Sequence, residues 1–587
     1  MRHTKSYIKG HPNPQFTRTD FENLNGVWNF VFDDEDIGMK KKYYSKFPAN
    51  PLQINVPYTY ETKRSGIEEH KVHNVVWYNR TFNYTPSKKD TYINFDGVDY
   101  YARVYVNGVY VGEHKGGYTR FSFNITSFLK KGENSITLRV YDDLDSARIR
   151  GKQRWKPESF ECFYVQTTGI WKTVWLEHKD PTHLDRVLMD PSYKYNTVQM
   201  EYRMVGDLTN VEIETIIHHE DELVCKERKA VTRNLFQQTF DITTESATMK
   251  AHCWNHTWPH LYDVVFNIYK DGKLVDTVLS YFGIAEYKAT GNCIYVNRHQ
   301  TFLKLILDQG YLPDAGLTFN EEDCIKDIQL MKDIKLNGCR KHQKIECDLF
   351  YYYCDIMGYY LWQELPSFYE YRKMNLAEVA SDWMEILYQH HNHPCIMTDV
   401  VINESWGTMA IKDRKEQQHF VTGLYHITKS IERNRFVVSN DGWEHTVSDL
   451  FTIHNYCSSY DELMLEFAID PANLDKDHRI VHTGPKSPCA DGFKNAEKPI
   501  ILSEFAGIAF SKDADKGWGY GNLVKDEDAF FERFNKQIEA IFDSGMFAGY
   551  CITQLSDVEQ EVNGFVDVDR NYKVSKERLA EILDKMY

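Results

Sequence analysis

In two stretches of this chain, an apolar run is followed by a glutamate. Residues 400–407 read VVINESWG, so Asn403 and Glu404 directly follow three β-branched residues. Residues 499–505 read PIILSEF and place Glu504 behind a similar run. Such a run is typical of a buried parallel strand, which would present its carboxylate at the end of the strand. Two carboxylates that meet over one substrate atom are what acid–base cleavage of a glycosidic bond requires. The alternative is that each glutamate only caps a helix or pairs with an arginine.

The composition limits the class of protein. At 587 residues the chain is too long for one core, and about two to four domains are expected. A net charge of −16 excludes nucleic acid as the main partner. No run has the length of a membrane span and no apolar leader begins the chain, so we expect a cytoplasmic protein without a membrane partner. Twelve cysteines without a Cys-x-x-Cys pair predict free thiols rather than a structural zinc site.

Residues 1–287 have the alternation of β-sheet proteins. Residues 26–32, GVWNFVF, place three aromatic side chains on one face of a strand. Asn107-Gly108 and Asp271-Gly272 each lie between alternating apolar residues and predict two-residue hairpin turns. The many short strands predict a β-sandwich over residues 1–180 and a second one, of immunoglobulin size, over residues 181–287.

After residue 288 strands alternate with helices. Eight apolar segments each end in polar or aromatic residues, and helical periodicity follows most of them. The predicted strands are 301–307, a short segment before Arg340, 359–362, 400–404, 436–439, 450–453, 500–504 and 549–553. This count over roughly 300 residues predicts a (β/α)₈ TIM barrel, whose active site lies at the carboxyl ends of the strands. Glu404 would end strand four and Glu504 strand seven.

Taken in order, these motifs resemble glycoside hydrolase family 2, the group of β-galactosidases, β-glucuronidases and β-mannosidases. NESWG at 403–407 is similar to the acid/base motif of that family, and SEF at 503–505 to its nucleophile motif. GIWKTVWLE at 169–177 and WPHLY at 258–262 are similar to signatures of its first two domains. The resemblance implies a jelly-roll sugar-binding-like domain at 1–180, an immunoglobulin-like domain at 181–287 and a catalytic TIM barrel at 288–587.

The chain departs from better-known members at three places. The domain junction reads FGIA at 282–285 and lacks the usual arginine, and the loop at 308–314, DQGYLPD, lacks the usual Arg/His-rich form. Glucuronidases of the family bind the sugar carboxylate with Asn-x-Lys after strand eight. The corresponding loop here, EVNGF at 561–565, has no lysine, and NYK at 571–573 lies further along. We therefore predict a β-galactosidase-like enzyme; a glucuronidase would need another cation, such as Lys344 or Lys512.

The resemblance implies a retaining mechanism. Glu504 would attack the anomeric carbon as an ionised nucleophile, and Glu404 would protonate the leaving oxygen and then activate water, with the carboxyl groups about 5–5.5 Å apart. We expect burial and the charge of Glu504 to raise the pKa of Glu404 so that it begins protonated. Asn403 would bind the 2-hydroxyl of the sugar, and Tyr456 would hydrogen-bond Glu504.

Other polar and aromatic residues at the strand ends are candidate sugar ligands, although each could instead serve packing. They are His342, His454, Trp443, Trp406, Asp308, Gln309, Glu364 and Gln554. The tract HHNH at 390–393 precedes strand four, at the opposite end of the barrel, so we expect it to be structural rather than metal-binding. No metal and no cofactor are expected.

The expected partner is a small carbohydrate or glycoconjugate, and a homo-oligomer remains open. An inactive carbohydrate-binding scaffold is the alternative from another class, since a fold does not determine a function. The presence of both carboxylates disfavours it. A metal-dependent hydrolase is the third reading, but it lacks a convincing ligand set.

Overall fold

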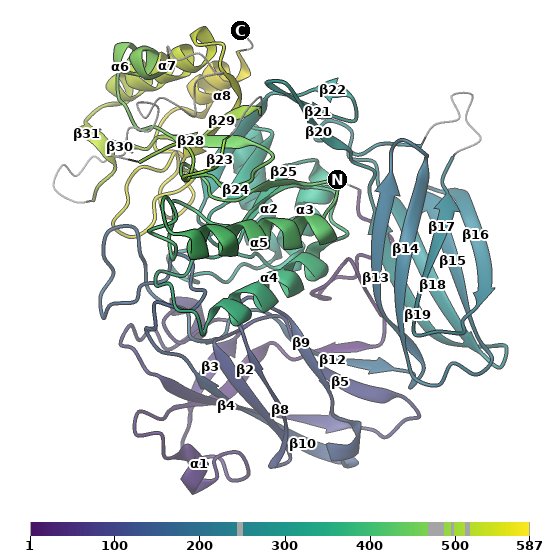
Figure 1. Ribbon diagram of the computed structural model, residues 1–587. Helices are drawn as coiled ribbons and strands as arrows, with labels where there is room; N and C mark the ends of the chain where they lie inside the picture. The colour runs from purple at the N-terminus through teal and green to yellow at the C-terminus, as the bar shows by residue number, and fades with distance from the viewer. Residues whose placement is uncertain (1, 244–250, 468–485, 495–497, 511–516, 586–587) are drawn as a thin grey trace.

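The computed structural model describes residues 2–243, 251–467, 486–494, 498–510 and 517–585. Figure 1 shows two β-sandwiches against a barrel: the N-terminal sandwich in purple below it and the second sandwich in blue beside it. Both termini of the chain lie on the barrel side of the molecule (Figure 1). The predicted jelly-roll, immunoglobulin-like and TIM-barrel architecture is confirmed at the level of these three folds.

The first sandwich packs a four-stranded sheet against a six-stranded sheet, both antiparallel. The first sheet has the order β1 (Phe21–Asn23), β12 (Val174–Lys179), β5 (Asp90–Phe95), β9 (Phe121–Asn124). The second has the order β3 (Leu52–Val56), β2 (Gly26–Phe32), β4 (Val75–Tyr84), β10 (Gly132–Tyr141), β7 (Tyr101–Val106), β8 (Val109–Lys115). Trp28 and Phe30 are buried in the core between the sheets. The short pair β6 (Val98–Asp99) and β11 (Gly169–Ile170) and helix α1 (Gly38–Lys41) complete the domain.

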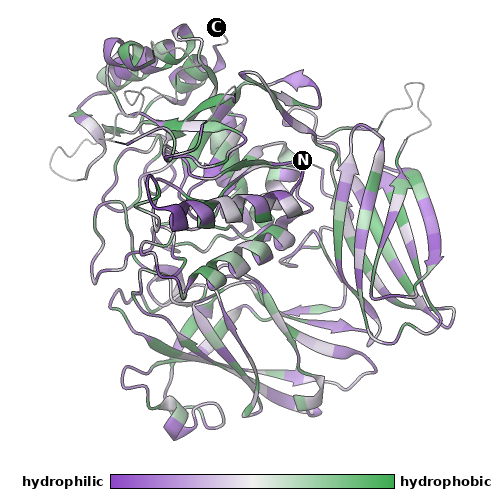
Figure 2. Ribbon diagram, in the orientation of Figure 1, coloured by the Kyte–Doolittle hydropathy of each residue, from purple (hydrophilic) through white to green (hydrophobic). Residues whose placement is uncertain are grey.

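The second sandwich also has two antiparallel sheets. Their orders are β13 (His183–Ser192), β14 (Thr197–Val205), β17 (Leu235–Asp241) and β16 (Glu222–Ala230), β15 (Val211–His219), β18 (Tyr262–Lys270), β19 (Lys273–Phe282). In β14 every second residue is buried, and Figure 2 shows the matching bands of polar and apolar residues. This alternation is what a sheet with one face on the core requires. A small sheet of β20 (Tyr287–Thr290), β21 (Cys293–Val296) and β22 (His299–Gln300) then leads into the barrel.

Both predicted hairpin turns are confirmed. Val106 pairs with Val109 across Asn107-Gly108, and both turn residues have positive φ angles of 50° and 78°. Lys270 pairs with Lys273 across Asp271-Gly272, with φ angles of 48° and 73°. Positive φ at both central positions defines the tight turn whose twist matches that of the flanking strands, and Asn, Asp and Gly accept it at little cost.

Eight parallel strands form the barrel, as predicted. Their order in the sheet is β27 (Phe436–Val438), β26 (Ile396–Val400), β25 (Tyr360–Glu364), β24 (Gly338–Lys341), β23 (Leu303–Asp308), β32 (Phe547–Thr553), β29 (Ile500–Ala506), β28 (Phe451–His454). Strands that pair in this sheet also follow one another along the chain. The exception is β23 and β32, the first and last strands of the barrel, which pair with each other. Within the described residues no ladder joins β27 to β28, so the barrel is nearly closed.

Helices cover the outside of the barrel (Figure 1). They are α2 (Glu321–Asp333), α3 (Asp348–Met357), α4 (Leu376–His390), α5 (Lys415–Ile431), α6 (Tyr460–Phe467), α7 (Glu527–Asp543) and α8 (Lys576–Asp584). Asn320 caps α2 through a reciprocal capping box with Asp323, which explains why the helix begins there. No described helix is both long and apolar enough to cross a membrane. All twelve cysteines lie in the described residues and none forms a disulfide, as predicted.

The first sandwich is tied to the barrel by buried polar contacts. Arg120 of the sandwich pairs with Asp348 at the start of α3, while Lys172 donates to the carbonyl of Glu346 at 2.8 Å. Arg64 binds Asp323 of α2 at 2.7 Å. These contacts dock the first sandwich against the barrel beside α2 and α3.

Candidate active site

The two predicted carboxylates lie at the same end of the barrel but in different backbone settings. Glu504 lies inside β29, two residues before its end. Strand β26 already ends at Val400, so Glu404 follows in a loop rather than at the strand tip that we predicted. Glu404 and Ser405 have φ angles of 50° and 60°, a left-handed turn that ends the extended run. The amide of Glu404 donates to the carbonyl of Asp441 at 3.0 Å, which holds this turn against the loop after β27.

His454, the last residue of β28, joins the two glutamates. Its Nδ1 lies 2.8 Å from Glu404 Oε1 and 3.5 Å from Glu504 Oε2, and its Nε2 lies 2.8 Å from Asp441 Oδ2. One oxygen of each glutamate and the Nδ1 atom all lie within 4.8 Å of one another. Oxygens this close favour the pair of carboxyl groups about 5–5.5 Å apart of retaining glycosidases over the about 6.5–9.5 Å of inverting ones.

Arg340, at the end of β24, organises the floor of the site. Its fully buried guanidinium donates from Nε to Glu364 (2.7 Å) and from Nη1 to Asp441 (2.5 Å) and Glu504 (3.0 Å). Its Nη2 donates to Asn403 Oδ1 at 2.6 Å. The five-donor fork of arginine therefore fixes one catalytic candidate and three neighbours from four different strands or their following loops.

The expected pKa of Glu404 is wrong in direction. Burial acts to raise it, but the hydrogen bond and charge of His454, together with Lys152 and Arg340, lower the pKa of Glu404 below its ordinary value. Burial likewise acts to lower the pKa of His454, but the charges of Glu504 and Asp441 raise it to about 10. The proton of this cluster therefore lies on His454 in the free protein. The prediction failed because it counted Glu504 as the neighbour of Glu404 and did not foresee the imidazolium.

Asn403 and Tyr456 make the contacts expected of site residues. The Tyr456 hydroxyl donates to Glu504 Oε2 at 2.5 Å, and its ring stacks on Tyr520 with the centroids 3.4 Å apart. Because Arg340 binds the other oxygen, each carboxylate oxygen of Glu504 accepts a hydrogen bond. Asn403 uses its oxygen for Arg340, while its buried Nδ2 has no partner among the described residues and is free to donate to a ligand.

The other predicted ligands divide into two groups. Asp308 is fully engaged, since Lys341 Nζ and the amide of Gly310 each take one of its oxygens at 2.7 and 2.8 Å. Glu364 is bound by Arg340, and burial raises its pKa to about 7. His342 Nδ1 lies 3.2 Å from both Glu364 Oε1 and Arg340 Nη2, and burial lowers the pKa of His342 well below its ordinary range.

Four of the predicted ligands keep a buried polar atom that has no partner among the described residues. They are Gln309 (Oε1), Gln554 (Oε1), Trp406 (Nε1) and Trp443 (Nε1). Such groups are costly to bury unless a ligand or water satisfies them. Together with Asn403 Nδ2 they offer both donors and acceptors around the carboxylates, as a polyhydroxylated ligand requires.

The first sandwich contributes side chains that sequence reasoning missed. Tyr164 donates to Glu561 in the loop after β32, and Phe163 packs edge-on against Trp406 with the centroids 5.9 Å apart. Lys152, paired in the backbone with Tyr164, is buried, and its Nζ lies 3.3 Å from Cys162 Sγ. The charges of Glu561, Glu404 and Glu504 help to raise the pKa of Lys152 against the effect of burial. A different domain thus supplies part of the barrel mouth, which no strand-end pattern could reveal.

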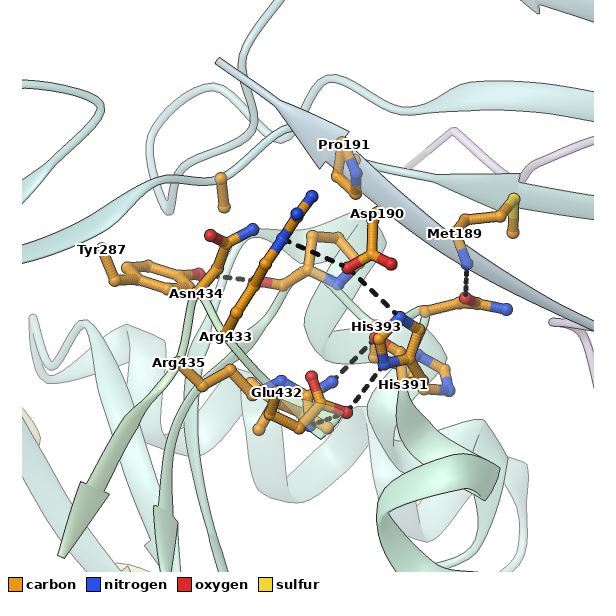
Figure 3. A pocket seen from close by; sticks show the side chains of 15 residues that line it. Met189, Asp190, Pro191, Tyr287, His391, His393, Glu432, Arg433, Asn434 and Arg435 are labelled. Atoms are coloured by element: carbon orange, nitrogen blue, oxygen red, sulfur yellow. Dashed lines mark hydrogen bonds and ion pairs between the residues drawn. The ribbon is translucent and has the colours of Figure 1, made fainter. Parts of the chain in front are cut away.

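The histidine tract at 390–393 lies at the junction with the second sandwich, where Figure 3 shows His391 next to Asp190 of β13. His391 binds Glu432 at 2.9 Å, and His393 binds Asp355 at 2.6 Å. His390 Nδ1 bonds Gln363 at 2.8 Å. Three separate partners hold the three rings, in agreement with the structural role that we predicted.

Two sandwiches on a barrel with paired carboxylates at its mouth form a three-domain architecture, and comparison with known families identifies it. Residues 21–180 match the sugar binding domain of glycosyl hydrolases family 2, residues 182–284 match that family's central domain, and residues 288–543 match its TIM barrel domain. The chain belongs to glycoside hydrolase family 2.

Relatives within the family are named for different sugars. A β-galactosidase of Thermoanaerobacter pseudethanolicus is 27% identical over 70% of the chain and 53% of its own length. A putative β-glucuronidase of Formosa agariphila is 24% identical over 73% of the chain and 51% of its own length. The chain thus spans about half the length of these curated relatives.

Solved structures share the whole architecture. The β-glucuronidase of Bifidobacterium dentium, complexed with coumarin-3-O-glucuronide, superposes with a TM-score of 0.79 over 97% of this chain and 98% of its own, at 16% identity. A β-galacturonidase of Eisenbergiella tayi gives 0.75 over 98% of both chains, at 17% identity. At these low sequence identities, the comparison shows only that the proteins share a fold.

Replacing Arg340 by methionine is expected to destabilise the barrel by about 3–5 kcal/mol, because three buried carboxylates lose their shared cation. The measurement is the midpoint of thermal unfolding. Arg372→Met is the matched control: this exposed arginine pairs with Asp145 and Glu370, and its loss should cost about 1 kcal/mol or less. Equal shifts in the two variants would contradict the role assigned to Arg340.

Proposed function

We propose that the chain is an exo-acting retaining β-glycosidase, with Glu504 as nucleophile and Glu404 as acid/base. The observation that carries the proposal is the single imidazole nitrogen within hydrogen-bonding or ion-pairing distance of both glutamates. The short distance between the nearest oxygens of the two glutamates supports double displacement. Their surroundings support these roles: Glu504 accepts a hydrogen bond on each oxygen, from Arg340 and Tyr456, whereas Glu404 has 22% of its side chain exposed and can reach a leaving group or water.

The mechanism has two balanced steps. Glu504 attacks the anomeric carbon and forms a glycosyl ester while the bond to the leaving oxygen breaks, and that oxygen takes a proton from Glu404. Water then gives a proton to Glu404 and attacks the same carbon, which releases Glu504 and the sugar with its β configuration retained. His454 supplies the proton to Glu404 through their 2.8 Å hydrogen bond, because its raised pKa keeps it charged in the free protein.

A terminal β-galactoside is the sugar that we propose first. The lysine of the NYK run, Lys573, donates to Asp557 and to the carbonyl of Val562, both at 2.8 Å, and is committed there. Lys344 is similarly held by Glu346 at 2.6 Å, while Lys512 lies outside the described residues. A β-galactosidase among the relatives supports this choice. The expected partner remains a small glycoside, and the cytoplasmic location and a homo-oligomer stay predictions.

A β-uronide is the second candidate, favoured by Lys152. This buried ammonium has three donors and bonds a thiol, so it has capacity for an anionic group. The glucuronidase among the relatives, together with the glucuronidase and galacturonidase among the structures of the same fold, is the further reason to test it.

A panel of aryl β-glycosides separates these candidates. Galactoside is expected to give the highest kcat/KM, well above glucuronide and galacturonide, because an unpaired sugar carboxylate would be costly to bury. Lys152→Met is the companion variant and should leave the ratio between the sugars little changed. Dominant turnover of a uronide that Lys152→Met reduces by about 10-fold or more would establish the second candidate instead.

A further inference from the structure

A cluster of three histidines lies in the second sandwich, outside the site described above. His219 ends β15, while His252 and His260 flank a turn that the backbone bridge between Trp254 and Pro259 closes before β18. One ring nitrogen of each histidine lies within 4.8 Å of those of the other two. Three segments of the chain thus bring three imidazoles to one point.

The three rings pack on one another rather than on hydrogen-bonding partners. The rings of His219 and His252 stack at 3° with centroids 3.9 Å apart, and His260 lies 5.4 and 5.2 Å from them. In the described part of the chain no ring nitrogen of the three makes a hydrogen bond. The backbone is nevertheless well anchored, because the amide of His252 donates to the Tyr262 hydroxyl at 2.7 Å. Preorganised imidazoles with free lone pairs are uncommon unless something uses them.

We propose that His219, His252 and His260 form a binding site for a divalent transition metal of the class that prefers imidazole, such as Zn²⁺, Ni²⁺, Co²⁺ or Cu²⁺. On a tetrahedral Zn²⁺ with bonds of about 2.0–2.1 Å, neighbouring nitrogens lie about 3.3 Å apart. Because the ring nitrogens lie up to 4.8 Å apart, they must approach one another by up to about 1.5 Å to bind one metal ion. Side-chain rotation supplies it, because His252 and His260 are only half-buried and lie outside the sheets.

We assign the fourth ligand position to Glu220. It follows His219 in the hairpin turn between β15 and β16, where its φ angle of 55° reverses the chain. Its carboxylate is held in the free protein by Arg2 at 2.8 Å. Arg2 is exposed and can be released into water. Metal binding therefore replaces a surface ion pair, which contributes little to stability, with a metal–carboxylate bond.

Zinc titration against a chromogenic chelator tests the proposal. The wild type is expected to bind one equivalent of Zn²⁺, and His252→Ala and His260→Ala to weaken binding by about 100-fold or more. Co²⁺ should give the intense visible bands of a tetrahedral site in the wild type and not in these variants. His299→Ala, an exposed histidine in β22, is the matched control and should bind as the wild type does.

The cluster of Glu404, His454 and Glu504 is the competing metal site, and Glu404→Gln separates the two. Zinc binding retained in Glu404→Gln and lost in His252→Ala supports the proposal. Binding lost only in Glu404→Gln, binding unchanged in both histidine variants, or no binding by the wild type overturns it. Glycosidase activity unchanged by EDTA in all histidine variants, with unchanged unfolding midpoints in the absence of metal, shows that these proteins are folded.

Discussion

Glu504→Ala is expected to lower kcat by about 10⁴–10⁶-fold on every aryl β-glycoside, whatever the leaving group. The substitution removes the atom that attacks the anomeric carbon, so the glycosyl ester cannot form. Steady-state kinetics with good and poor leaving groups measure the loss. A mechanism-based 2-fluoro glycoside should label Glu504 in the wild type, and peptide mass spectrometry locates the label.

The fold should survive this substitution. Arg340 keeps Glu364 and Asp441 as partners when Glu504 is lost, so the buried cation remains paired. The unfolding midpoint of Glu504→Ala should therefore stay close to that of the wild type, in contrast to that of Arg340→Met. Label found on Glu404, or activity that survives in Glu504→Ala, would show that the nucleophile has been assigned wrongly.

Glu404→Ala is expected to impair cleavage strongly when the leaving group is poor but much less when it is good. Loss of the general acid costs about 10²–10⁴-fold when the leaving oxygen needs a proton. Dinitrophenolate needs little protonation, so the first step should remain fast while the second, which lacks its general base, becomes slow. The glycosyl-enzyme should then accumulate, which gives a burst and a lowered KM.

Azide distinguishes the two variants by the product it forms. It should rescue Glu404→Ala by attacking the glycosyl-enzyme from the vacated side and give a β-glycosyl azide. Any product from Glu504→Ala should be the α-glycosyl azide, because azide then replaces the nucleophile itself. Nuclear magnetic resonance of the products determines the anomer, and the reverse pair of outcomes would exchange the two roles.

Much of the fold follows from local pattern. Asn107-Gly108 and Asp271-Gly272 specify tight turns by backbone preference alone, so their hairpins are predictable from a few residues. The apolar runs before His342, Glu364, Glu404 and Glu504 predict barrel strands because both faces of such a strand are buried. The end of β26 was placed four residues too late, since the turn at Glu404 and Ser405 depends on contacts with the loop after β27.

Interactions between distant segments escaped prediction. The sequence places Arg340, a charged residue, in a predicted barrel strand next to His342. Its four partners could not be predicted, because they come from strands and loops between 24 and 164 residues away. Lys152 and Tyr164 belong to another domain, and nothing in their local sequence directs them to the barrel mouth. Their roles exist only after the sandwich has docked.

The three folds, and the end of the barrel at which the two candidate glutamates lie, could be predicted from residue order, because propensity and burial act within short windows of chain. The direction of the pKa shift of Glu404 became clear only from the assembled fold. Burial and the negative charge of Glu504 alone would have kept Glu404 protonated, but His454 arrives from a neighbouring strand with Asp441 behind it and takes the proton. A pKa depends on every charge within a few ångströms, and those neighbours are assembled by the fold rather than by their order in the chain.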